Sequence, residues 1–384
     1  MTSYERVLNT LNRKPVDQCP IVIGPWEETE KRWIKEGHYS QGQNVRELFD
    51  MDLRWDGSLN MIADLDCVPE TVEETEDTIS MRDGNGAVLR KHKGKSGTPE
   101  HVDFRVKDRQ GWEELIKPFF QSVDKRRIPY EKYRSMRKYC AEKQLFLFCG
   151  VVAPFELMHP VCGHENLLVG MALDPEWIQD MVNVYSDSII NHLEELFAKE
   201  GKPDGFYFFE DMGFRDHPFF STSMYRELIK PGHVRLFDFA HSCGCKVMMH
   251  SCGFIEPLLD DVIDAGLDCL QGMEAKAGMD LAKLHETYGK RIAFCGGVDA
   301  RALISNDRSK IDAELDAKVA PVLAAGGGYI LSTDHSEPPE IDFDTLIYFI
   351  EKGREMSRRR KYSADHARQH IPHSRAGMEF LPVR

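Results

Sequence analysis

The feature that most constrains the fold of this chain is a regular alternation of short apolar runs and longer helical stretches over residues 145–332. Each apolar run spans five or six residues without strict polar alternation, which is typical of strands buried on both faces. Strands that alternate with helices predict a parallel sheet. The expected strands are 145–149, 205–209, 245–250, 269–273, 291–295 and 328–332, and the expected helices are 175–199, 223–241, 255–265, 280–288 and 310–325.

Earlier in the chain, an amphipathic helix is expected at residues 3–12, an apolar strand at 19–23 and another strand near Leu53. The total is then about eight β/α units. We therefore predict an α/β fold with a single (β/α)8 TIM barrel over residues 1–351. No G-x-G-x-x-G motif follows any of these strands, so a dinucleotide site is not expected.

Residues 67–106 differ from the rest of the chain, because short β-type runs alternate there with turn residues. Asp83-Gly84 and Asn85-Gly86 are strong hairpin signals. This pattern predicts a small β-meander inserted into the barrel.

Residues 352–384 form the end of the last predicted helix and a basic C-terminal tail. They hold nine Lys and Arg residues and three acidic residues, a net charge of +6. Such a segment is either a solvated tail or a surface that docks onto an acidic partner or a neighbouring subunit.

Charge and hydropathy exclude several classes of protein. The 384 residues carry a net charge of −14, whereas nucleic-acid binding needs a basic footprint. No uncharged apolar stretch approaches the roughly 18 residues of a membrane span, and the N-terminus has no apolar run of a signal peptide. We expect a cytoplasmic protein, a monomer or homodimer, whose ten cysteines are reduced.

Metal-competent side chains follow several of the predicted strands. His250-x-Cys252 ends one strand, and its two side chains point the same way because strand side chains repeat with period two. His335 follows the last strand and supplies a third ligand, as a catalytic Zn²⁺ site requires. Cys295 and Glu210 compete as third or fourth ligands. The alternative is a buried thiol beside a histidine that hydrogen-bonds a loop carbonyl.

Glu210 and Asp211 form a carboxylate pair at another strand end. Two neighbouring carboxylates push one pKa upward, which suits general acid–base catalysis. The pair could equally bind the metal, hold a cationic substrate, or cap a helix. Candidates for an aromatic pocket are Trp26, Trp33, Phe155, Phe214 and Phe219, and the segments 24–45, 57–70 and 154–170 are expected to be specificity loops.

Several motifs in the sequence resemble the uroporphyrinogen decarboxylase superfamily, which includes cobalamin-dependent methyltransferases. The resemblance implies a single (β/α)8 barrel and extends over nearly the whole chain. The segments that carry it are 4–8, 13–17, 154–156, 210–213, 224–231, 250–253, 296–299 and 328–332 ahead of 338–340.

Two branches of this superfamily differ at sites that can be compared with this chain. In true decarboxylases an arginine-rich motif after the first strand binds the porphyrinogen carboxylates. The matching residues 24–30 are acidic here, with no arginine before Arg32, so this activity is rejected. The methyltransferase branch carries a His-x-Cys motif and a later cysteine that bind zinc together. His250 and Cys252 match, whereas His335 stands at the place of the later cysteine.

The resemblance therefore implies a zinc-dependent methyltransferase. Zinc on His250, Cys252 and His335 would polarise the oxygen of a small methylated, in the first instance methoxylated, substrate. Glu210 or Asp211 would act as an acid or an extra ligand. The methyl group would pass to the corrinoid (cobalamin) of a separate corrinoid protein. The alternatives are a metal-dependent decarboxylase or lyase of a small carboxylate, and a non-enzymatic barrel that binds a corrinoid or tetrapyrrole.

Overall fold

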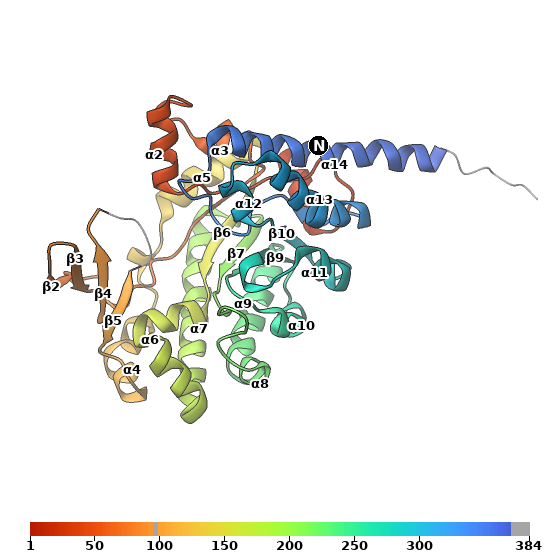
Figure 1. The fold of residues 1–384 in the computed structure, drawn as a ribbon. Helices are drawn as coiled ribbons and strands as arrows, with labels where there is room; N and C mark the ends of the chain where they lie inside the picture. Colours follow the sequence, from red (N-terminus) through yellow and green to blue (C-terminus); the bar gives the residue numbers. More distant parts are fainter. Residues whose placement is uncertain (95–98, 370–384) are drawn as a thin grey trace, which may run out of the picture.

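A curled sheet of seven parallel strands forms the centre of the computed structural model, which describes residues 1–94 and 99–369 (Figure 1). The strand order is β1-β6-β7-β8-β9-β10-β11, and every neighbouring pair is parallel. The predicted α/β class and parallel sheet are therefore confirmed. The strands are β1 (Leu53–Asp56), β6 (Phe146–Val152), β7 (Gly205–Phe209), β8 (Lys246–Ser251), β9 (Cys269–Gly272), β10 (Ala293–Gly296) and β11 (Tyr329–Ile330).

Residues 20–22 join the two edges of this sheet without forming a regular strand. Ile21 forms an isolated parallel bridge with Leu331, and Val22 N–H donates to Leu331 O at 3.0 Å. On the other side, Asp52 N–H donates to Ile21 O at 3.3 Å. Pro20 has no N–H to donate, which shortens the ladder. The strand expected at 19–23, which would have made the number of strands eight, is thus reduced to a single bridge. The sheet is a seven-stranded half-barrel, and this bridge links its two edges.

Helices cover the outside of the sheet, and each helix predicted from periodicity is present with shifted ends or as shorter pieces. Among the described residues, no helix is long and apolar enough to cross a bilayer. The α-helices are α1 (Ser3–Leu11), α2 (Glu27–Glu36), α3 (Val45–Leu48), α4 (Arg109–Leu115), α5 (Tyr130–Lys143), α6 (Pro154–Leu173), α7 (Pro175–Glu200), α8 (Thr222–Met224), α9 (Lys230–Ser242), α10 (Leu259–Asp264), α11 (Leu281–Tyr288), α12 (Ala300–Ile304), α13 (Arg308–Ala325) and α14 (Phe343–Gln369). Shorter turns are the 3₁₀ helices η1 (Lys117–Phe120), η2 (Lys125–Arg127), η4 (Glu256–Leu258) and η5 (Ala275–Ala277) and the π-helical η3 (Tyr225–Ile229).

Two segments that we expected to be loops contain helices. Residues 24–45 include α2, and 154–170 lie within α6. Pro160 and a kink at Gly163 (φ 76°) interrupt α6, which obscures its periodicity in the sequence. Helix α14 carries the chain to Gln369, and the rest of the predicted basic tail, residues 370–384, lies outside the described residues.

The β-meander expected at 67–106 is present as an antiparallel sheet beside α6 (Figure 1). Its strands are β2 (Glu70–Glu74), β3 (Thr78–Arg82), β4 (Ala87–His92) and β5 (Glu100–Phe104). The ring of Phe104 lies against the kink in α6, where a Cβ on Gly163 would come within 2.4 Å of the Phe104 Cε2 atom. Glycine at this kink therefore lets the meander pack onto the barrel.

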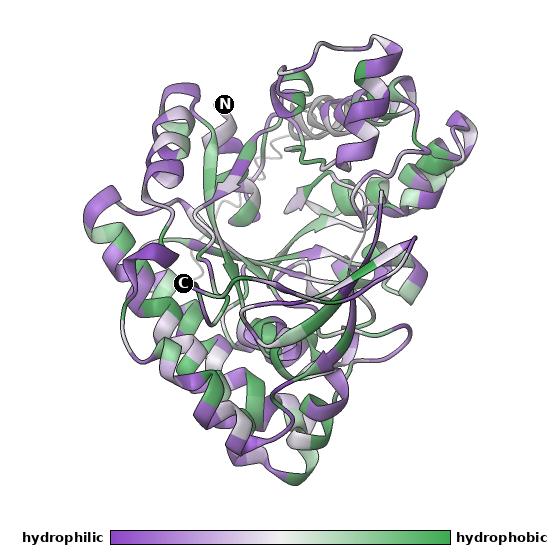
Figure 2. Ribbon diagram, turned by 90° about the vertical axis from the view of Figure 1, so that its left-hand side faces the viewer, coloured by the Kyte–Doolittle hydropathy of each residue, from purple (hydrophilic) through white to green (hydrophobic). Residues whose placement is uncertain are grey.

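The strands of the parallel sheet are buried on both faces. In β8, for example, Val247, Met248 and Met249 are each at most 2% exposed. Figure 2 shows the central strands as mainly hydrophobic, whereas the surrounding helices alternate between hydrophobic and hydrophilic positions. The inside of the curled sheet is therefore largely a packed core.

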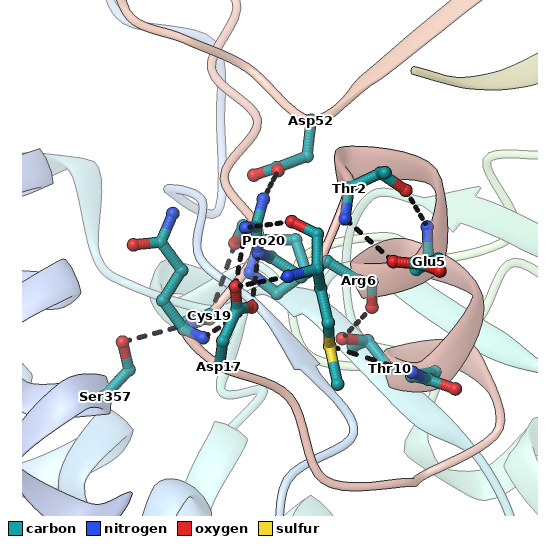
Figure 3. A network of polar contacts seen from close by, with 12 residues as sticks. Thr2, Glu5, Arg6, Thr10, Asp17, Cys19, Pro20, Asp52 and Ser357 are labelled. Carbon is teal, nitrogen blue, oxygen red and sulfur yellow. Dashed lines mark hydrogen bonds and ion pairs between the residues drawn. The ribbon is translucent and has the colours of Figure 1, made fainter. Parts of the chain in front are cut away.

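A buried ion-pair network fastens α1 to the bridged edge of the sheet (Figure 3). The Arg6 guanidinium donates to Asp17 through Nε (2.8 Å) and Nη2 (3.0 Å), and through Nη1 to Asp52. Asp52 in turn accepts the N–H of Ile21 at 3.0 Å. A single arginine thus holds together α1, the bridging segment and the start of β1.

Replacing Arg6 by methionine should lower the free energy of unfolding by about 3–5 kcal/mol, because Asp52 would stay buried without a counter-charge. Urea denaturation followed by circular dichroism measures this loss. The control is Lys31→Met, which removes an exposed pair with Glu27 and should cost less than about 1 kcal/mol. Equal losses in the two variants would contradict the role assigned to Arg6.

Candidate metal and active site

A cavity of about 530 Å³ opens at the carboxyl ends of the parallel strands. In a β/α barrel this end carries the variable loops on which chemistry is built. Among the described residues that line the cavity there is no lysine or arginine. The lining consists of Val22, Ile23, Gly24, Leu53, Trp55, Tyr207, Phe209, Asp211, Met248, His250, Cys252, Gln271, Cys295, Ser332, Thr333, Asp334, His335 and Ser336.

Three of these side chains form a first group of metal-competent donors, here called the His250 trio: Asp211, His250 and Cys252. His250 stands near the end of β8 and Cys252 two residues later, so both side chains turn toward the cavity. The Cys252 Sγ atom lies 3.3 Å from His250 Nε2, which lies 3.4 Å from Asp211 Oδ1. Asp211 Oδ1 also accepts the N–H of Cys252 at 2.7 Å, which fixes the carboxylate beside the thiol.

Cys252 also belongs to a second group, the His335 trio: Cys252, Glu274 and His335. The His335 Nε2 atom lies 3.6 Å from Glu274 Oε1, and Glu274 Oε2 accepts the N–H of Gly253 at 3.0 Å. In each trio the donor atoms lie within 4.8 Å of one another. The three predicted ligands His250, Cys252 and His335 thus line one cavity. His250 and His335 belong to different trios, however, and the two trios share Cys252 alone.

Glu274 and Asp211 extend the donor set beyond the three predicted ligands. Asp211 was expected as an acid or an extra ligand, whereas Glu274 was not expected as a ligand. Its position directly after β9 was the available signal, because the other donors also follow strands. A glutamate in such a place can also serve to hold a loop, as Glu274 does by accepting the N–H of Gly253, so position alone does not identify a ligand.

Burial sets the protonation states of His250 and Cys252, and of these only that of the Cys252 thiol would change on cation binding. Burial lowers the pKa of His250, which keeps the imidazole neutral. Burial also raises the pKa of the Cys252 thiol, and the nearby Asp211 and Glu274 carboxylates raise it further. With no lysine or arginine on the described cavity wall, a bound divalent cation would supply the missing positive charge and favour the thiolate.

The geometry of the His250 trio fits zinc. Bonds of about 2.0–2.3 Å at tetrahedral angles place neighbouring ligand atoms roughly 3.3–3.8 Å apart. The separations of 3.3 and 3.4 Å at His250 Nε2 fall in that range. Imidazole, thiolate and carboxylate are also the side-chain groups that zinc accepts.

Glu210 lies away from the cavity lining, although it precedes Asp211 in the chain. Its fully buried carboxylate accepts the N–H groups of Phe155 (3.1 Å) and Glu156 (2.9 Å) at the start of α6. It also pairs with His233 Nε2 at 2.8 Å. These contacts correspond to the helix-cap alternative considered from the sequence.

Cys295 lines the cavity, but its thiol belongs to neither trio. Burial raises its pKa. Of the two additional ligands considered from the sequence, Cys295 faces the cavity whereas Glu210 does not.

The aromatic side chains of the cavity differ from those we expected. The structure places none of Trp26, Trp33, Phe155, Phe214 and Phe219 in its lining. The wall is instead formed by Trp55, Tyr207 and Phe209. Trp55 stacks on Tyr207 with ring centroids 6.0 Å apart, and Phe209 stacks on His250 at 4.6 Å. These residues lie within strands, where packing in the core was the default expectation.

Comparisons with known proteins agree with this fold. The family model of uroporphyrinogen decarboxylase matches residues 94–356. A solved methyltransferase from Methanosarcina mazei has a similar structure, with a TM-score of 0.63 at 18% sequence identity. The similarity covers 92% of this chain and 98% of that protein. No curated protein matches this chain by sequence.

In the metal-free protein, alkylation of Cys252 by iodoacetamide should show a pH midpoint above the usual range of a cysteine, because its pKa is raised. Peptide mass spectrometry across a pH series measures this midpoint. Asp211→Asn should move the midpoint to lower pH, since it removes a negative charge beside the thiol. A midpoint at or below that of a free cysteine peptide would contradict the electrostatics of the site.

Proposed function

The chain belongs to the uroporphyrinogen decarboxylase family, and we propose that it is a zinc-dependent methyltransferase that moves a methyl group from a small methoxylated substrate to a corrinoid protein. The observation that carries the proposal is a His–Cys–carboxylate donor set at the floor of a cavity without lysine or arginine in its described lining. The fold shared with the Methanosarcina mazei methyltransferase supports it.

The charge of the cavity argues against the decarboxylation that gives the family its name. A porphyrinogen with many carboxylates needs several cations around it. The lining instead carries the carboxylates of Asp211 and Asp334. Outside the lining, the first turn of α2 carries Glu27, Glu28 and Glu30 and no arginine. A neutral substrate such as a methyl ether suits this environment better than a polyanion.

The residues that would hold zinc are those of the His250 trio, Asp211, His250 and Cys252, whose separations fit the ion. His335, which shares Cys252 with Glu274 in the second trio, would be the additional ligand. Bound there, the ion would act as a Lewis acid toward an ether oxygen and would stabilise the alkoxide that leaves. Cys252 is indispensable in this arrangement, because it is the one donor that both trios share.

The side chains around the donors would orient the substrate and handle its proton. Trp55, Tyr207 and Phe209 form an aromatic wall that excludes water from the methoxy group. Asp211 lies at the cavity surface with its side chain 29% exposed, so it is the carboxylate placed to take up a proton from solvent and pass it to the leaving oxygen. Glu210 contributes indirectly, by holding the start of α6.

Metal analysis tests the site. The purified protein should contain about one zinc per chain, and His250→Ala or Cys252→Ser should retain less than about a tenth of it, since each removes a ligand. The matched control is Cys243→Ser, which changes a thiol before β8, at the opposite end of the barrel. Full zinc occupancy in either ligand variant would exclude this assignment.

Substrate turnover tests the reaction. With a corrinoid protein reduced to Co(I), the enzyme should remove the methyl group of an aryl methyl ether, which NMR detects as the free phenol. His250→Ala should abolish this loss. Release of carbon dioxide from a small carboxylate without any corrinoid protein would instead establish the lyase alternative.

A further inference from the structure

His250 has a second hydrogen-bonding partner that the donor set does not include. Its Nδ1 atom contacts Oε1 of Gln271, on the neighbouring strand β9. The two residues are paired in the register of the parallel ladder between β8 and β9. Their side chains therefore project from the same level of the same face of the sheet.

The same oxygen of Gln271 receives a second donor. The hydroxyl group of Tyr207, on strand β7, donates to Gln271 Oε1 at 2.9 Å. An amide oxygen has two lone pairs and can accept from both partners at once. The Tyr207 hydroxyl therefore helps to keep the oxygen of this amide, rather than its NH₂ group, directed at the imidazole.

This arrangement decides which imidazole nitrogen is free. When the oxygen faces Nδ1, that nitrogen carries the proton and donates it. The lone pair then lies on Nε2, the atom 3.3 Å from Cys252 Sγ and 3.4 Å from Asp211 Oδ1. Phe209, stacked on the ring at 4.6 Å, limits the rotation that would exchange the two nitrogens.

We propose that Gln271, oriented by Tyr207, is the positioning residue that holds His250 in the tautomer whose Nε2 can ligate the metal. The inference rests on the proposed zinc site and goes further, because it assigns a function to a residue that is not itself a ligand. It also gives Tyr207 two roles. Its ring lines the cavity beside Trp55, and its hydroxyl group orients the Gln271 amide that contacts His250.

The test compares zinc affinity, measured by competition with a chelator, among variants of these two residues. Gln271→Leu leaves Nδ1 without an acceptor and should weaken zinc binding about 10–100-fold. Gln271→Glu keeps an acceptor in place and should bind zinc at least as tightly as the wild type. Tyr207→Phe should give a smaller loss than Gln271→Leu, because it removes only the support of the amide.

The absorption spectrum of the Co²⁺-substituted protein is the second readout, because it reports the ligand geometry directly. It should change in Gln271→Leu and recover in Gln271→Glu, a rescue that a merely structural role would not produce. The matched control is Gln110→Leu, on the exposed helix α4, which should leave both affinity and spectrum unchanged.

The outcomes separate this inference from the proposed function. Wild-type affinity and spectrum in Gln271→Leu would overturn it, and so would weaker binding in Gln271→Glu, which would indicate that the amide acts as a donor. In both cases the wild-type protein would still bind zinc. A wild-type protein that binds no zinc would instead overturn the proposed function, and this inference with it.

Discussion

The register of the parallel ladder is the constraint on which the site depends. Across β7 to β10, Phe209 pairs with His250, His250 with Gln271, and Gln271 with Cys295. These side chains therefore lie at one level near the carboxyl end of the barrel. A slip of one residue in any strand would turn its side chain into the surrounding helices. The isolated bridge between Ile21 and Leu331 links the last strand to the edge that Arg6 and Asp52 hold.

The strand ends could be predicted because apolar runs and period-two geometry are properties of the sequence itself. His250, Cys252 and His335 were therefore predicted near one another, and the β-meander was predicted at its observed place. The strand expected at 19–23 is shorter than predicted, because Pro20 removes a hydrogen-bond donor from a segment that is already short. Glu274 and Gln271 could not be predicted, since their importance depends on side-chain contacts across neighbouring strands. Glu210 shows the same limit, because it follows β7 directly, yet its carboxylate is held by the start of α6 and by His233, away from the cavity that Asp211 lines.

Charge connects the site to its proposed chemistry. Asp211 and Glu274 are tied by backbone N–H groups to the loop that carries Cys252. Their negative charges and burial oppose the thiolate, and no lysine or arginine on the described cavity wall compensates them. Such a cluster is stabilised by a divalent cation and is unfavourable for a polyanionic substrate. The same feature thus favours a metal site and supports the proposal that this member of the family does not decarboxylate a porphyrinogen.

The most direct test of this account is anomalous diffraction at the zinc absorption edge from a crystal of the protein as purified. The account predicts a single strong peak at the carboxyl end of the barrel, about 2.0–2.3 Å from both His250 Nε2 and Cys252 Sγ. It also predicts that Nδ1 of His250 faces Gln271 and makes no contact with the ion. An anomalous peak elsewhere in the chain would contradict the account. So would the absence of an anomalous peak between His250 and Cys252 in crystals grown with added zinc.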